Sequence, residues 1–121
     1  MTTNELVACA VAAMENKKGT EISVIDISKV SVVADYFMLV SGTNQKQTQA
    51  IADEIEEKLA KHEVFPRQKE GYNSGTWILL DYQDVVIHIF NGEDRRFYNL
   101  ERIWADGITV DPKSFRIEEE E

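Results

Sequence analysis

The chain has 121 residues, of which 43% are hydrophobic and 29% charged, and its formal net charge at pH 7 is -9. This length and composition are typical of one globular domain with a single hydrophobic core, and they exclude a disordered chain. The acidic excess argues against direct sequence-specific nucleic-acid binding and favours a basic protein as the partner, because phosphate contacts depend on lysine and arginine.

The N-terminal segment predicts a helix. Thr2 and Glu5 have capping-box spacing, and apolar residues then recur every four positions, so we expect a helix over about residues 3–17. Cys9 is the single cysteine and cannot form an internal disulfide, which favours a reducing cytoplasm. The segment has no basic start, unlike a signal peptide, and no apolar run reaches the roughly 20 residues of a membrane helix.

Two strands and a second helix are expected next. The β-branched segment 21–27 predicts one strand, and the continuous apolar run 36–40 predicts a central strand that is buried on both faces. Residues 41–44, Ser-Gly-Thr-Asn, are expected to form the turn into the second helix. Asn44 is the expected N-cap of this helix, which continues to about residue 62.

The segment from Trp77 to Trp104 is the most informative part of the chain. A weak or edge strand, interrupted by Pro66, is expected before it. The segment itself begins with two apolar strands joined by a short polar turn, which predicts a β-hairpin. With a two-residue turn at 82–83, Trp77 would lie opposite His88.

The predicted hairpin has two chemically different faces, because side chains alternate along a strand. One face, here called the aliphatic face, is expected to join the core and consists of Ile78, Leu80, Val85, Ile87 and Ile89. The other, here called the mixed face, consists of Trp77, Leu79, Asp81, Val86, His88 and Phe90. A combination of large apolar groups with a carboxylate and an imidazole is typical of a surface that meets another protein.

A third helix is expected over about residues 93–104, where Tyr98 would flank the mixed face. The rest of the chain has no strong periodicity and ends in four glutamates, so residues 107–121 are expected to form an extended acidic tail. The order of elements predicts an α/β fold: a single domain with a mixed sheet of about five strands flanked by helices.

The sequence lacks a recognisable catalytic set. It has no glycine-rich phosphate loop, no HExxH and no CxxC motif, and we expect no cofactor. Asp81 and Asp84 could hold a magnesium ion, and the Ser41-Gly42 turn could grip a triphosphate, so a metal-dependent nucleotidyltransferase-like enzyme is one alternative. However, no Asp-x-Asp pair lies on a strand, and the spacing of the two aspartates also suits a tight turn. A homodimer that uses the mixed face only for itself is another alternative.

Seven segments of the chain resemble one known family. They are residues 34–37, 40–43, 50–55, 70–72, 75–82, 84–90 and 98–104. Taken in this order, they make the chain similar to the ribosomal silencing factors, the RsfS or Iojap-like proteins. The resemblance covers residues 1–106 and leaves 107–121 outside it.

The resemblance implies a nucleotidyltransferase-like fold that lacks the catalytic carboxylates, and therefore a protein that is not an enzyme. It implies a translational repressor that binds the large ribosomal subunit through ribosomal protein L-fourteen and sterically blocks joining of the small subunit under nutrient limitation. Relatives are often homodimers when free. The expected contact residues are Trp77, Leu79, Asp81, Tyr82, His88 and Phe90, with Tyr98 beside them.

Overall fold

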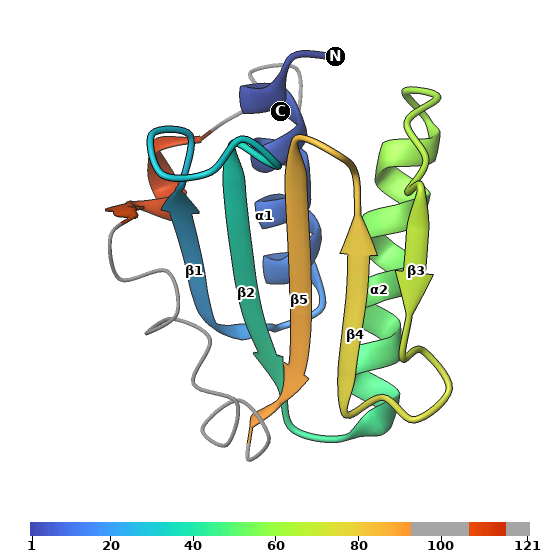
Figure 1. Ribbon diagram of the computed structural model, residues 1–121. Coiled ribbons are helices and arrows are strands. Elements are labelled where there is room, and N and C mark those ends of the chain that lie inside the picture. The colour runs from blue at the N-terminus through green and yellow to red at the C-terminus, as the bar shows by residue number, and fades with distance from the viewer. Residues whose placement is uncertain (93–106, 116–121) are drawn as a thin grey trace.

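A six-stranded mixed sheet forms the centre of the computed structural model, which describes residues 1–92 and 107–115 (Figure 1). The strand order is β3-β4-β5-β2-β1-β6, with β2 and β5 parallel and the other neighbours antiparallel. The strands are β1 (Thr20–Asp26), β2 (Tyr36–Gly42), β3 (Gln68–Glu70), β4 (Trp77–Asp81), β5 (Val85–Asn91) and β6 (Ile108–Val110). This arrangement confirms the predicted single α/β domain with a mixed sheet, although the sheet has one strand more than expected.

Two α-helices, α1 (Thr3–Asn16) and α2 (Gln45–Ala60), lie behind the sheet in the view of Figure 1 and cover the same face of it. Both begin at the predicted N-caps. The Thr2 hydroxyl accepts the backbone N–H of Glu5 at 3.1 Å, and the Glu5 carboxylate accepts the N–H of Thr2 at 2.8 Å. The Asn44 side chain accepts the N–H of Gln47 at 2.9 Å. These caps satisfy amides that have no partner inside the helix.

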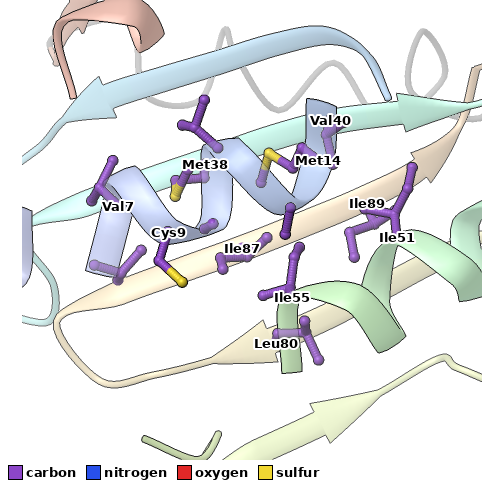
Figure 2. Packing of buried hydrophobic residues seen from close by; sticks show 14 of the residues in the cluster. Val7, Cys9, Met14, Met38, Val40, Ile51, Ile55, Leu80, Ile87 and Ile89 are labelled. Atoms are coloured by element: carbon purple, nitrogen blue, oxygen red, sulfur yellow. The ribbon is translucent and has the colours of Figure 1, made fainter. Parts of the chain in front are cut away.

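The main core lies between the two helices and the sheet. Every residue of the aliphatic face is fully buried there, which confirms the predicted core face. Figure 2 shows Val7, Cys9 and Met14 of α1 beside strand residues of this cluster, with Ile51 and Ile55 reaching it from α2. Burial of large aliphatic side chains at about 1.5 to 3 kcal/mol each is the main force that holds the helices on this face.

The opposite face of the sheet carries a second cluster. Its buried members are Ile25, Ile27, Ala34, Phe37, Leu39 and Phe90, and Trp77 and Val86 pack against them. Strand β2 contributes to both clusters, with Met38 and Val40 on the helix side and Phe37 and Leu39 on the other. This confirms the prediction that the apolar run 36–40 is a central strand.

The C-terminal part of the chain differs from the expected tail. Residues 108–110 pair with β1, and Val110 lies opposite Val24. The short 3-10 helix η1 (Pro112–Ser114) follows, and the ring of Phe115 packs edge-on against Tyr36 at 5.6 Å between centroids. A three-residue strand is too short to show periodicity in the sequence, and it forms because β1 offers it an open edge. The expected third helix lies outside the described residues.

Candidate partner-binding surface

The hairpin that carries the mixed face consists of β4 and β5, and its register differs from the predicted one. Trp77 lies opposite Phe90, and Leu79 lies opposite His88, so the predicted pairing of Trp77 with His88 was wrong by two residues. An even shift leaves every side chain on its predicted face, because side chains alternate with a period of two. The composition of the two faces is therefore as predicted.

The turn explains the shift. The backbone N–H of Tyr82 donates to the carbonyl oxygen of Val85 at 2.9 Å, and Gln83 adopts a left-handed φ of 77°. The Asp81 side chain accepts the N–H of Gln83 at 2.8 Å. Asp81 thus forms an Asx-type turn, and the chain reverses at Gln83 and Asp84, one residue later than the predicted 82–83. Asp81 therefore has the turn-forming role that was the alternative to binding a metal ion.

Tyr82, one of the predicted contact residues, does not lie on the mixed face. Only 7% of its surface is exposed, and it belongs to the core cluster beneath the helices. Burial raises the pKa of its phenol, and the hydroxyl has no hydrogen-bond partner within the described residues. Tyr82 follows the last residue of β4, so the strand alternation turns it toward the helices. Tyr98, the flanking residue, lies outside the described part of the chain.

The mixed face has an accessible part and a covered part. Trp77, Leu79, Asp81 and Val86 are partly exposed. His88 is only 6% exposed and Phe90 is fully buried, so these two predicted contacts lie underneath the accessible residues. A partner that approaches this face can reach Trp77, Leu79 and Asp81 directly. Val86, which lies opposite Asp81, is also partly exposed on this face, although it is not among the predicted contacts.

An aromatic cluster supports Trp77. The indole N–H of Trp77 donates to Nδ1 of His88 at 2.8 Å, and the Trp77 and Phe90 rings stack with 5.4 Å between centroids. The ring of Phe37 on β2 also packs against His88, with 4.3 Å between the ring centroids. Burial lowers the pKa of His88 to about 4, so the imidazole is neutral at physiological pH. The role of Phe37 could not be seen in the sequence, since it depends on β2 lying beside β5.

Hydrogen bonds attach the loop before β4 to α2. They thereby fix the position of Trp77, which is the first residue of β4. The Tyr72 hydroxyl donates to the Asp53 carboxylate at 2.9 Å, and the Gln49 side chain donates to the carbonyl oxygen of Tyr72 at 2.8 Å. The Thr48 hydroxyl donates to the carbonyl oxygen of Gly75 at 2.8 Å. Trp77 therefore projects from a well-anchored backbone.

Asp81 supplies negative charge to the accessible part of the mixed face. Its carboxylate lies 3.3 Å from Nε of Arg67, whose side chain is about half exposed. Only 13% of the Asp81 side chain is exposed, but the arginine is largely solvated, so the pair is worth on the order of 1 kcal/mol and a basic partner can compete for the exposed part of the carboxylate. In the residues that the structure describes, no group of three or more His, Cys, Asp or Glu side chains is arranged to hold a metal ion.

Ser41 and Gly42, predicted to lie in the turn before α2, are instead the last two residues of β2, and the turn that follows at Thr43 and Asn44 is closed by the chain itself. The backbone N–H and the hydroxyl of Thr43 both donate to Oε1 of Gln47, at 2.7 and 2.9 Å. A Cβ on Gly42 would lie 3.0 Å from Cγ2 of Thr48. The amide that could receive a phosphate thus has an internal acceptor, which weighs against the nucleotidyltransferase-like alternative.

Comparison with known proteins identifies the family. The family described as "Ribosomal silencing factor during starvation" matches residues 1–121. The chain belongs to the ribosomal silencing factor family. The ribosomal silencing factor RsfS of Bacillus subtilis is 36% identical over 111 residues, which cover 92% of this chain and 94% of the relative.

Two crystal structures are similar to this chain throughout the fold. One, of a protein from Chromobacterium violaceum, has a TM-score of 0.84 at 31% identity and covers 87% of this chain and 88% of its own. The other, from Bacillus halodurans, has a TM-score of 0.81 at 34% identity and covers 90% and 99%. In the described residues of this chain, neither helix is long and apolar enough to cross a membrane.

Proposed function

We propose that this protein binds the large ribosomal subunit through the accessible part of its mixed face and thereby blocks joining of the small subunit. Membership of the silencing factor family supports the activity, which represses translation during starvation. The observation that supports the surface is the partly exposed indole of Trp77, fixed by a hydrogen bond and placed beside Leu79 and Asp81. The partner on the subunit is ribosomal protein L-fourteen, as the resemblance implies.

The chemistry of this surface suits a basic protein. Trp77 and Leu79 offer apolar area, and Asp81 offers a carboxylate whose internal ion pair is weak. Large rigid aromatic side chains contribute most of the binding free energy in many interfaces. The net charge of -9 attracts a basic surface from a distance and raises the association rate. His88 and Phe90 act from below, by supporting Trp77.

The block needs no chemical reaction. A bound protein occupies space that the small subunit must enter, so repression depends on the fraction of large subunits that are occupied. The fold corresponds to that of a nucleotidyltransferase without its catalytic carboxylates. The protein acts in the cytoplasm and is a homodimer when free. If the dimer uses the mixed face, self-association competes with ribosome binding.

The test is sedimentation of the purified full chain with isolated large subunits, followed by addition of small subunits. We expect the protein to pellet with large subunits and to reduce the fraction of joined ribosomes in proportion to occupancy. Isolated small subunits alone are the control and should not carry the protein down. Absence of co-sedimentation at micromolar protein would overturn the proposal, as would binding that leaves subunit joining unchanged.

A further inference from the structure

We infer that His88 is a positioning residue, which holds the indole of Trp77 so that its ring, and not its N–H, meets the ribosomal partner. This inference rests on the proposed function and adds which atoms of Trp77 the partner can use. It starts from the hydrogen bond between Nε1–H of Trp77 and Nδ1 of His88, at 2.8 Å.

Both side chains of this pair are held in place by their neighbours. His88 is 6% exposed, with the Phe37 ring at 4.3 Å and the Phe90 ring nearly parallel to it, 8° apart at 6.1 Å. Trp77 stacks on Phe90, which lies directly opposite it on β5. The ring of His88 therefore cannot turn without displacing aromatic neighbours, and its Nδ1 presents a fixed acceptor to the indole.

The protonation of His88 follows from this bond. Because Nδ1 accepts a hydrogen bond, the single proton of the neutral ring lies on Nε2. Nε2 is buried and has no hydrogen-bond partner within the described residues. Burying a donor without an acceptor costs free energy. A phenylalanine would fill this position without that cost, so the imidazole contributes what phenylalanine lacks, which is the acceptor that faces Trp77.

The consequence for binding concerns the chemistry of the partner. An indole has one hydrogen-bond donor, and in this protein His88 already receives it. The partner therefore contacts Trp77 through the ring, with aliphatic groups or with a lysine or arginine placed over its face. A cation is the better match, since the acidic Asp81 lies on the same face of β4.

Two variants of His88 separate the acceptor from the ring. His88→Phe keeps an aromatic side chain and removes the acceptor, whereas His88→Asn places a carboxamide oxygen close to the position of Nδ1. We expect His88→Phe to lower the affinity for large subunits about tenfold and His88→Asn to stay within about threefold of the wild type. In Trp77→Phe, which has no indole N–H, adding His88→Phe should cause little further loss.

The state of the indole is measured separately, by the exchange rate and chemical shift of the Trp77 Nε1–H in nitrogen-15 NMR spectra of the free protein. The wild type and His88→Asn should show slow exchange, and His88→Phe fast exchange. If His88→Phe folds, exchanges fast and still binds large subunits like the wild type, the positioning role is wrong. If His88→Phe does not fold, fast exchange of the Trp77 Nε1–H in the wild type would overturn the positioning role. Wild-type protein that does not bind large subunits at all would instead overturn the proposed function.

Discussion

Gly71 packs against the backbone of Trp77 so closely that a Cβ at Gly71 would lie 2.0 Å from the carbonyl oxygen of Trp77. The φ of Gly71 is +79°, a conformation that L side chains rarely adopt. We expect Gly71→Ala to lower the free energy of unfolding by about 2 to 4 kcal/mol, because both the contact and the backbone must change. Urea denaturation followed by circular dichroism measures this.

Gly92→Ala is the matched control for this substitution. Among the residues that the structure describes, the nearest atom to a Cβ at Gly92 is the Gly42 carbonyl oxygen at 3.6 Å, an ordinary contact distance. We expect Gly92→Ala to change the free energy of unfolding by less than about 1 kcal/mol. Equal effects of the two substitutions would contradict the tight packing between the loop and the start of β4.

His88 makes the stability depend on pH. Its pKa is about 4 in the folded chain, because burial disfavours the charged form, against 6.5 for a histidine in water. Between these pH values the unfolded chain binds more protons, so the free energy of unfolding rises with pH from about 4 to 6.5 and then stays level. The separation corresponds to about 3 kcal/mol.

The carboxylates also titrate near this range, so the measurement compares the wild type with His88→Phe. The difference in their free energies of unfolding, obtained by urea denaturation at a series of pH values, isolates the imidazole. We expect this difference to change by up to about 3 kcal/mol between pH 4 and 6.5 and to be constant above pH 7. A difference that does not vary with pH would mean that His88 is not buried as a neutral ring.

Local signals in the sequence were sufficient to predict most of the elements. The caps at Thr2 and Asn44 fix where the helices begin, and both are local side-chain interactions. The alternation along β4 and β5 fixes which side chains face the core, and this alternation survives a shift of two residues. Both signals therefore gave correct predictions without knowledge of the tertiary structure.

The missed features are one local turn conformation and several contacts between distant segments. The predicted hairpin register was wrong because Gln83 adopts a left-handed conformation, which the Asp81 side chain stabilises. This conformation is uncommon for a glutamine and cannot be predicted from the residue type. Strand β6 exists because β1 offers it an edge. The burial of His88 depends on Phe37, and Phe37 lies near it because β2 pairs in parallel with β5. Trp77 is partly exposed on the face predicted for it, whereas the burial of His88 could not be predicted from the alternation along β5.

Trp77→Ala tests the proposed binding surface. Removal of a large, fixed aromatic side chain from the centre of an interface should cost about 2 kcal/mol or more of binding free energy, which is roughly a thirtyfold loss of affinity. Sedimentation with large subunits over a range of protein concentrations measures it. Phe65→Ala is the matched control, since Phe65 is an exposed aromatic residue that lies outside the hairpin. Equal affinities of the two variants would contradict the proposal that the mixed face binds the large subunit.

Asp81→Asn tests the electrostatic part of the same surface. Asparagine keeps the side-chain oxygen that accepts the Gln83 N–H and loses only the charge, so the turn should be retained. Because the ion pair with Arg67 is largely solvated on the arginine side, the free energy of unfolding should fall by less than about 1 kcal/mol. The association rate with large subunits should fall several-fold at low salt, and the rates of the two proteins should converge as salt screens the charge.

Stopped-flow measurement with a fluorescent label on the protein gives the association rate at each salt concentration. Glu57→Gln is the matched control, because Glu57 is an exposed carboxylate on α2, on the opposite side of the sheet. It removes the same charge from the molecule and should slow association much less than Asp81→Asn does. If both substitutions slow association equally, the attraction belongs to the net charge of the whole chain, and Asp81 does not meet a basic group at the interface.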